Sequence, residues 1–91
     1  MTVQVRIPTI LRKHTGGDKQ VEGSGATLGE LFTDLDARYP GLRGGVVDDD
    51  GSLRRFVNVY VNDEDVRFLG ATGATLSDGD VVTILPAVAG G

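Results

Sequence analysis

The chain has 91 residues, no cysteine and a net charge of −4. This length supports one hydrophobic core with little room for an enclosed substrate cavity, which disfavours an enzyme. Without cysteine the chain can form neither a disulfide scaffold nor a thiolate metal site. The acidic net charge repels phosphate backbones, which disfavours a nucleic-acid-binding protein. Because the sequence shows neither a signal peptide nor about 20 consecutive apolar residues, we expect a cytoplasmic domain that does not contact membranes.

The first part of the chain has the pattern of a hairpin. Alternate residues are apolar, which predicts a strand over residues 2–11. Turn residues at 14–18 return the chain to a second strand at 19–22, and the small residues at 23–26 then break the pairing. We therefore expect two antiparallel strands at the start of the fold.

The apolar period then changes to that of a helix. Apolar residues three and four positions apart form one stripe, at Leu28, Leu31, Phe32 and Leu35. Thr27 is placed to cap the N-terminus of this helix, and Glu30 completes a capping box in which each side chain accepts from an otherwise unpaired backbone N–H. The turn residues at 39–41 end the helix.

The second half of the chain is dominated by strand patterns. A long polar loop that contains a short turn of its own is predicted over residues 41–55. It is followed by a clear strand at 56–62, a short strand at 66–68 and a final strand at 81–85. The final run is apolar on both faces, as in a central strand. The order of elements indicates an α+β domain, with one mixed sheet packed against one main helix.

The strand at 56–62 carries a candidate docking surface. Valines occupy one face, and the other face presents Phe56, Asn58 and Tyr60, which either meet partner proteins or include buried aromatic side chains. The acidic turn at 63–65 either faces a basic partner surface or keeps the domain soluble.

The last five residues carry no polar side chain. They are Ala87, Val88, Ala89, Gly90 and Gly91. Fully extended, they span about 16 Å, so we expect a folded part over residues 1–86 and a flexible tail over 87–91. The tail offers no general acid or base, so chemistry at this end would use the Gly91 carboxylate. The bland alternative is a glycine-rich terminus with no role.

Two weaker motifs are rejected. The acidic run at 48–51 would place valines at the first and last positions of a calcium loop, where oxygen ligands are required. His14 has no evident catalytic partner nearby in the sequence, so we interpret it as a surface turn residue. We therefore expect no catalytic residue, no metal site and no bound cofactor.

Three stretches of the chain, over residues 7–17, 55–68 and 78–91, resemble the ThiS/MoaD-like family of ubiquitin-like sulfur carriers. Within that family they are most similar to the carriers of actinobacterial cysteine biosynthesis. The resemblance implies a β-grasp fold over residues 1–86 and a tail, 87–91, that is inserted into partner enzymes.

The resemblance also implies a reaction cycle. An adenylating, E1-like enzyme would use ATP to join the Gly91 carboxylate to AMP, and a sulfur donor would convert the product to a thiocarboxylate. A cysteine synthase dependent on pyridoxal phosphate (PLP) would accept this sulfur, and a zinc metallopeptidase would release cysteine and regenerate Gly91. The chain would act as a monomer, because its tail must enter these partners in turn.

Other functions remain open from the sequence. Many molybdopterin-type carriers have a second proline where this chain has Ala87, which favours cysteine biosynthesis over molybdopterin or thiamine assembly without excluding them. A ubiquitin-like modifier would instead form isopeptide bonds through Gly91. A non-covalent interaction module on the same fold would not need the tail.

Overall fold

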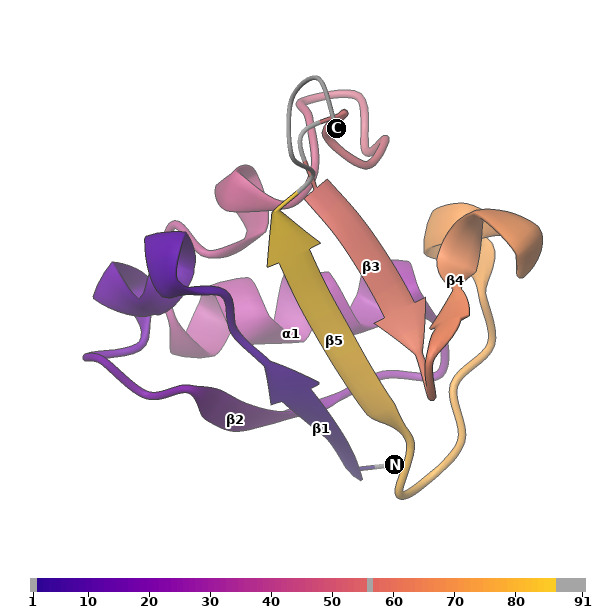
Figure 1. Ribbon diagram of the computed structural model, residues 1–91, viewed down its shortest axis with the longest axis horizontal. Coiled ribbons are helices and arrows are strands. Elements are labelled where there is room, and N and C mark those ends of the chain that lie inside the picture. The colour runs from indigo at the N-terminus through magenta and orange to yellow at the C-terminus, as the bar shows by residue number, and fades with distance from the viewer. Residues whose placement is uncertain (1, 56, 87–91) are drawn as a thin grey trace.

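The computed structural model describes residues 2–55 and 57–86, and Figure 1 shows a sheet with one long helix behind it. Within these residues the sheet has five strands: β1 (Thr2–Arg6), β2 (Gln20–Ser24), β3 (Val57–Val61), β4 (Glu64–Asp65) and β5 (Val81–Pro86). The helix is α1 (Leu28–Arg38). Short 3₁₀ helices lie between these elements: η1 (Thr9–His14), η2 (Arg43–Gly45), η3 (Val66–Phe68) and η4 (Ala71–Gly73).

The sheet is mixed, and its last strand lies at its centre. The strand order is β2-β1-β5-β3-β4, with β5 parallel to β1 and antiparallel to β3. The outer pairs β1–β2 and β3–β4 are antiparallel. These findings confirm the expected α+β fold, with one mixed sheet and one main helix, and the central position of the final strand. In the part of the chain that the structure describes, no helix is both long enough and apolar enough to span a membrane.

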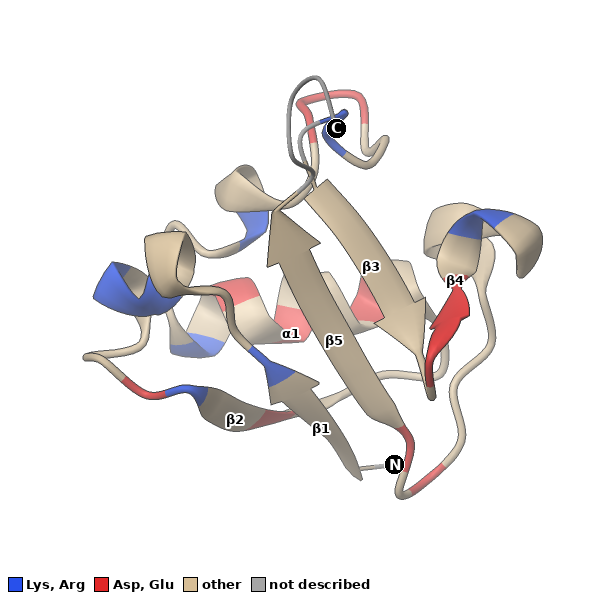
Figure 2. Cartoon of the chain, viewed as in Figure 1, with Lys and Arg blue, Asp and Glu red and all other residues tan. Residues whose placement is uncertain are grey.

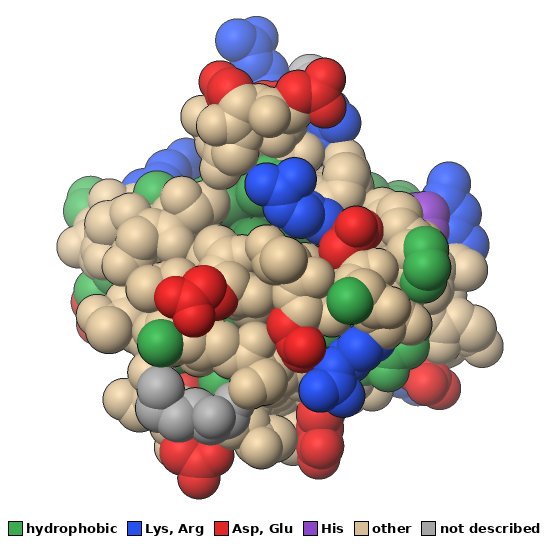
Figure 3. All heavy atoms as spheres, turned by 180° about the vertical axis from the view of Figure 1, so that it is seen from behind, with side chains coloured by type: hydrophobic (Ala, Val, Ile, Leu, Met, Phe, Trp, Pro, Cys, Tyr) green, Lys and Arg blue, Asp and Glu red, His purple; other side chains and the backbone are tan. Residues whose placement is uncertain are grey.

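The core lies between α1 and the face of the sheet that it covers (Figure 1). The strands contribute buried aliphatic side chains, chiefly Val3, Val5, Val59, Val82 and Ile84. The helix contributes the predicted stripe, Leu28, Leu31, Phe32 and Leu35, each of which is at most 1% exposed. Seen from the helix side, side chains of both charges are scattered over the surface (Figure 3). The alternating apolar pattern of the strands and the apolar stripe of the helix therefore correctly predicted which side chains form the core between the sheet and α1.

The predicted cap starts the helix. The Thr27 hydroxyl accepts from the Glu30 N–H at 3.3 Å, which confirms Thr27 as the N-cap. The Glu30 carboxylate accepts from the backbone N–H of Ala26 at 3.4 Å rather than from that of Thr27, one residue away from the ideal capping box. The helix ends before Tyr39, as expected.

Both predictions for the limits of the first hairpin are wrong. The first strand ends at Arg6 instead of residue 11, because Pro8 has no N–H to donate and the chain turns into η1, which buries Leu11. The second strand continues through Ser24 and pairs with Thr2. Gly23 does not break this pairing, because it packs beneath α1 where a Cβ would lie 2.6 Å from the Leu31 side chain.

The second half contains two further corrections. The loop over 41–55 is not simply polar, since it buries the apolar residues Leu42, Val46 and Val47. The short turn expected within it is η2. The segment 66–68 is the 3₁₀ helix η3 rather than a strand. The Asp65 carboxylate accepts from the Arg67 N–H at 2.9 Å, and this cap turns the chain as soon as β4 ends.

Candidate functional site at the end of the central strand

The predicted tail begins at the end of β5. Pro86, the last residue of the described ranges, pairs with Val57 of β3. The same strand pairs with β1 on its other side, through Val81 to Thr83. The described part of the chain therefore ends in a strand that is paired on both sides. The predicted tail itself, Ala87 to Gly91, lies outside the described residues.

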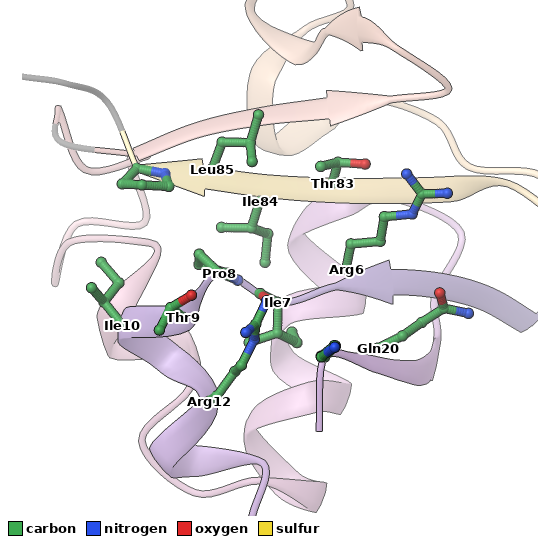
Figure 4. A pocket seen from close by; sticks show the side chains of 12 residues that line it. Arg6, Ile7, Pro8, Thr9, Ile10, Arg12, Gln20, Thr83, Ile84 and Leu85 are labelled. Carbon is green, nitrogen blue, oxygen red and sulfur yellow. The ribbon is translucent and has the colours of Figure 1, made fainter. Parts of the chain in front are cut away.

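An open groove of about 630 Å³ lies beside this point (Figure 4). Three segments form its walls: residues 6–12 of β1 and η1, residues 19–20 at the start of β2, and residues 83–86 at the end of β5. Buried Leu11 attaches η1 to the core, so the wall opposite β5 is held in place. The groove thus brings together segments that are more than 60 residues apart in the sequence.

Two aliphatic side chains are exposed at the groove. Ile10 of η1 is 60% exposed and Leu85 of β5 is 45% exposed. Figure 4 shows Leu85 on β5 and Ile10 on η1, which are two different walls of the groove. Large apolar side chains that lie together at the surface are typical of contact sites for partners. The apolar character of the groove therefore favours a protein segment as its occupant.

The groove is also basic, in contrast to the chain as a whole. Arg6, Arg12 and Lys19 line it, although the net charge of the chain is −4. The Nε of Arg12 donates to the carbonyl of Ile7 at 3.1 Å, which holds this side chain against the wall. Figure 2 shows Lys and Arg residues gathered at η1. A partner that fills the groove would be attracted if its contact surface were acidic.

Two of the three predicted docking residues lie on the face of the sheet opposite α1. Asn58 and Tyr60 are both half-buried on β3, and they pair with Leu85 and Thr83 of β5. Arg6 of β1 pairs with Thr83 from the other side. The face of Asn58 and Tyr60 is therefore continuous with the groove. Phe56, the third predicted residue, lies outside the described residues.

An ion pair fixes the far edge of this face. The guanidinium of Arg67 lies 2.6 Å from the Asp65 carboxylate and also donates to the Asn58 side chain at 3.3 Å. The hydrogen bonds from the side chain and backbone of Arg67 lower the pKa of Asp65, and the same pair raises the pKa of Arg67. Both groups are therefore charged at neutral pH.

The rejected motifs have structural roles in the described residues. Asp48 pairs with Arg54 at 3.2 Å, and the N–H of Ser52 donates to Asp50, which lowers the pKa of Asp50. His14 is half-buried and lies against Gly41, just after α1. No group of three or more His, Cys, Asp or Glu side chains with metal-binding spacing occurs among residues 2–55 and 57–86.

The groove is not predicted by any local pattern in the sequence. Its basic residues lie in two separate segments, and Ile10 was assigned to a strand by the alternating pattern. One signal was available: Pro8, which cannot donate within a strand ladder, predicts an early end of the first strand and an irregular segment after it.

Comparisons with known proteins identify the family and the fold. The sequence model that describes the ThiS family matches residues 5–91 of this chain. "Sulfur carrier protein CysO" of Mycobacterium tuberculosis is 59% identical over 93 residues, covering 100% of both chains. The crystal structure of Mycobacterium tuberculosis CysO has a TM-score of 0.91 at 58% identity, covering 94% of this chain and 99% of that chain.

Two further relatives extend the comparison. A chain of the Amycolatopsis orientalis BexX/CysO complex has a TM-score of 0.91 at 57% identity, covering 98% of this chain and 99% of that chain. "Small archaeal modifier protein 3" of Haloferax volcanii is 41% identical over 66 residues, covering 72% of this chain and 71% of the relative. The chain therefore belongs to the ThiS family, as a sulfur carrier with the ubiquitin-like β-grasp fold rather than an enzyme.

Proposed function

We propose that this chain carries sulfur for cysteine biosynthesis on the C-terminal carboxylate of Gly91. The observation that supports this most strongly is the 59% identity with a CysO sulfur carrier over the full length of both chains. The family match extends to residue 91 and so includes the Gly90-Gly91 end. The position of the tail at the end of the central strand is consistent with a rigid domain that presents a reactive terminus.

The first step is activation of the carboxylate. A terminal carboxylate has a reference pKa of about 3.3–3.7 and is ionised at neutral pH, so it is a poor electrophile. An E1-like partner enzyme joins the Gly91 carboxylate to AMP, with release of pyrophosphate from ATP. A sulfur donor then attacks the acyl carbon and displaces AMP. The product is a thiocarboxylate, whose sulfur is an exposed nucleophile at the end of a tether.

The second step transfers this sulfur. A PLP-dependent cysteine synthase presents an aminoacrylate made from O-phosphoserine, and the thiocarboxylate sulfur adds to its terminal carbon. A new carbon–sulfur bond forms, which joins the cysteine skeleton to the carrier. A zinc metallopeptidase hydrolyses the adduct, releases cysteine and restores the Gly91 carboxylate. The carrier is thus a substrate in each step and contributes no acid or base from Ala87, Val88, Ala89 or Gly90.

The folded part of the chain supplies recognition. Glycine has no Cβ, so Gly90 and Gly91 suit an enzyme channel that excludes side chains. The apolar and basic groove beside Pro86 then contacts an acidic surface at the entrance to that channel. The carrier acts as a monomer, which leaves the groove and tail free for successive partners.

Intact-mass measurement tests this function. The full-length chain and a variant lacking Gly91 are incubated with ATP, sulfide and the adenylating enzyme of the same organism. We expect the full-length chain alone to gain the mass difference between sulfur and oxygen. Addition of O-phosphoserine and the cysteine synthase should then yield a carrier–cysteine adduct. Conversion of the variant lacking Gly91, or no conversion of the full-length chain, would contradict the proposal.

Protein modification is a second candidate function. It is supported by the 41% identity with a small archaeal modifier protein. In this case activated Gly91 would form isopeptide bonds with lysine residues of target proteins. Adducts of higher mass in the native cytoplasm that resist thiols and hydroxylamine would support it.

If thiocarboxylate forms but cysteine does not, molybdopterin or thiamine assembly becomes the better interpretation.

A further inference from the structure

The apolar side chain of Phe68 projects from the edge of the sheet. It is 84% exposed, more than Ile10 or Leu85 at the groove. The adjacent residue, Leu69, is 36% exposed, so the two form a small apolar protrusion that we call the Phe68 knob. It lies at the end of η3, beyond β4, on the opposite side of the sheet from η1 (Figure 1). It is thus separate from the groove.

The knob is held by its backbone. Val66 at the start of η3 is fully buried, and its carbonyl accepts from the N–H of Leu69 at 2.9 Å. After the knob, Gly70 and Ala71 both have positive φ, at 101° and 54°. Positive φ is uncommon for a residue with a Cβ, so Ala71 stores backbone strain to shape this turn. An aromatic side chain on a fixed backbone loses little conformational freedom when it binds.

The knob is connected to the predicted docking face. Arg67 precedes Phe68, and its guanidinium turns back to Asp65 and to the Asn58 side chain. These contacts hold η3 against β3, and the Phe68 side chain beside them is exposed. The knob is thus linked through Arg67 to the face of β3 that carries Asn58 and Tyr60.

The charges on this side are opposite to those at the groove. Asp63 and Glu64 are exposed in the turn and in β4, and neither takes part in the ion pairs found within the described residues. Figure 2 shows β4 as acidic and η1 as basic. A partner for the knob therefore fits best if it presents an apolar pocket with Lys or Arg side chains beside it.

We propose that the Phe68 knob is the anchor by which the adenylating enzyme recognises this carrier, through an apolar pocket with a basic rim. This inference rests on the proposed function. The adenylating enzyme meets an ordinary carboxylate, which carries no chemical mark that distinguishes it from the C-terminus of any other protein. Enzymes that act later have a thiocarboxylate to recognise. Selection at the first step therefore depends on the folded surface in addition to the Gly90-Gly91 end.

Pyrophosphate exchange tests the inference. The adenylating enzyme of the same organism is assayed for carrier-dependent exchange of labelled pyrophosphate into ATP. Phe68→Ala should raise the KM for the carrier about tenfold or more, with little change in kcat, as for loss of an interface anchor. Phe68→Leu, which keeps an apolar side chain, should recover most of the affinity. Equal melting temperatures would show that the variants remain folded.

A charge reversal tests the partner's chemistry. Glu64→Lys should raise KM several-fold, whereas Glu22→Lys, the same change on the edge strand β2, should have little effect. If the wild-type chain supports exchange and Phe68→Ala has an unchanged KM, the knob inference is wrong and the proposed function stands. If the wild-type chain supports no exchange, the proposed function itself fails.

Discussion

Gly25 lies against the backbone of Leu31 so closely that a Cβ at Gly25 would stand 2.6 Å from the Leu31 nitrogen. This contact joins the end of β2 to the second turn of α1. It sets the position of the helix over the sheet, because the neighbouring groups are backbone atoms that cannot rotate away.

The Gly25–Leu31 contact predicts a large effect of a single methyl group. Gly25→Ala should lower the free energy of unfolding by about 1–3 kcal/mol, as expected when a tightly packed site receives an extra carbon. Gly44→Ala is the matched control, since a Cβ there meets nothing within 4 Å, and its effect should stay within about 0.5 kcal/mol. Urea unfolding measures both. Equal stabilities of the two variants would contradict the packing argument.

The N-cap of α1 makes a second prediction. Thr27→Ala removes the hydroxyl that accepts from the Glu30 N–H and should cost about 1 kcal/mol of unfolding free energy. Thr33→Ala makes the same change within the helix, where the hydroxyl only donates to the Gly29 carbonyl. That variant should be nearly neutral, because alanine is the better helix former. Thermal unfolding distinguishes the two, and an equal loss for both would count against the cap.

The ion pair of Asp65 and Arg67 makes stability depend on pH. The pKa of Asp65 is lower in the folded state than in the unfolded state. The carboxylate therefore stabilises the fold at pH values above its unfolded-state pKa of about 3.9, and this stabilisation is lost as the pH falls through the folded-state pKa. Asp65→Asn should therefore reduce Tm near neutral pH and have a smaller effect at pH values below the folded pKa. A difference in Tm between wild type and variant that does not shrink in acid would rule out this linkage.

The basic groove predicts a salt-sensitive effect on activation. Lys19→Glu should reduce kcat/KM for thiocarboxylate formation several-fold at low salt, because it introduces an acidic group where an acidic partner docks. The effect should shrink as salt rises, since charges are screened over about 10 Å at 0.1 M. Lys13→Glu, on η1 but outside the groove lining, is the control. If both substitutions reduce kcat/KM equally, the effect comes from the net charge of the chain and not from a contact at the groove.

The regular elements of the fold were predictable because their signals are local. The apolar stripe from Leu28 to Leu35 and the valines of β3 each repeat with the period of their element, and both are buried as expected. The central place of β5 was also predictable, since a strand covered on both sides has few polar residues. The predicted tail over residues 87–91 lies outside the described residues and stays a prediction.

The errors arose where a local pattern competed with a tertiary contact. Ile7 and Leu11 are both buried, but Leu11 reaches the core from a 3₁₀ turn, so alternation extended the strand too far. Gly23 resembled a strand breaker because its contact with α1 is invisible in the sequence. The groove and the Phe68 knob were missed for a related reason. Each depends on which side chains remain exposed, and that is decided by segments distant in the chain.

The central position of β5 also has a mechanical consequence. If the proposed activating enzyme pulls on the chain beyond Pro86 in the direction of β5, the force acts along the axis of this strand. Since β5 is bonded to β1 on one side and to β3 on the other, such a force loads both ladders in shear, and many hydrogen bonds must fail together. An edge strand pulled in the same direction would be held by one ladder only. A pulling force on the C-terminal end can therefore be strong without unfolding the domain.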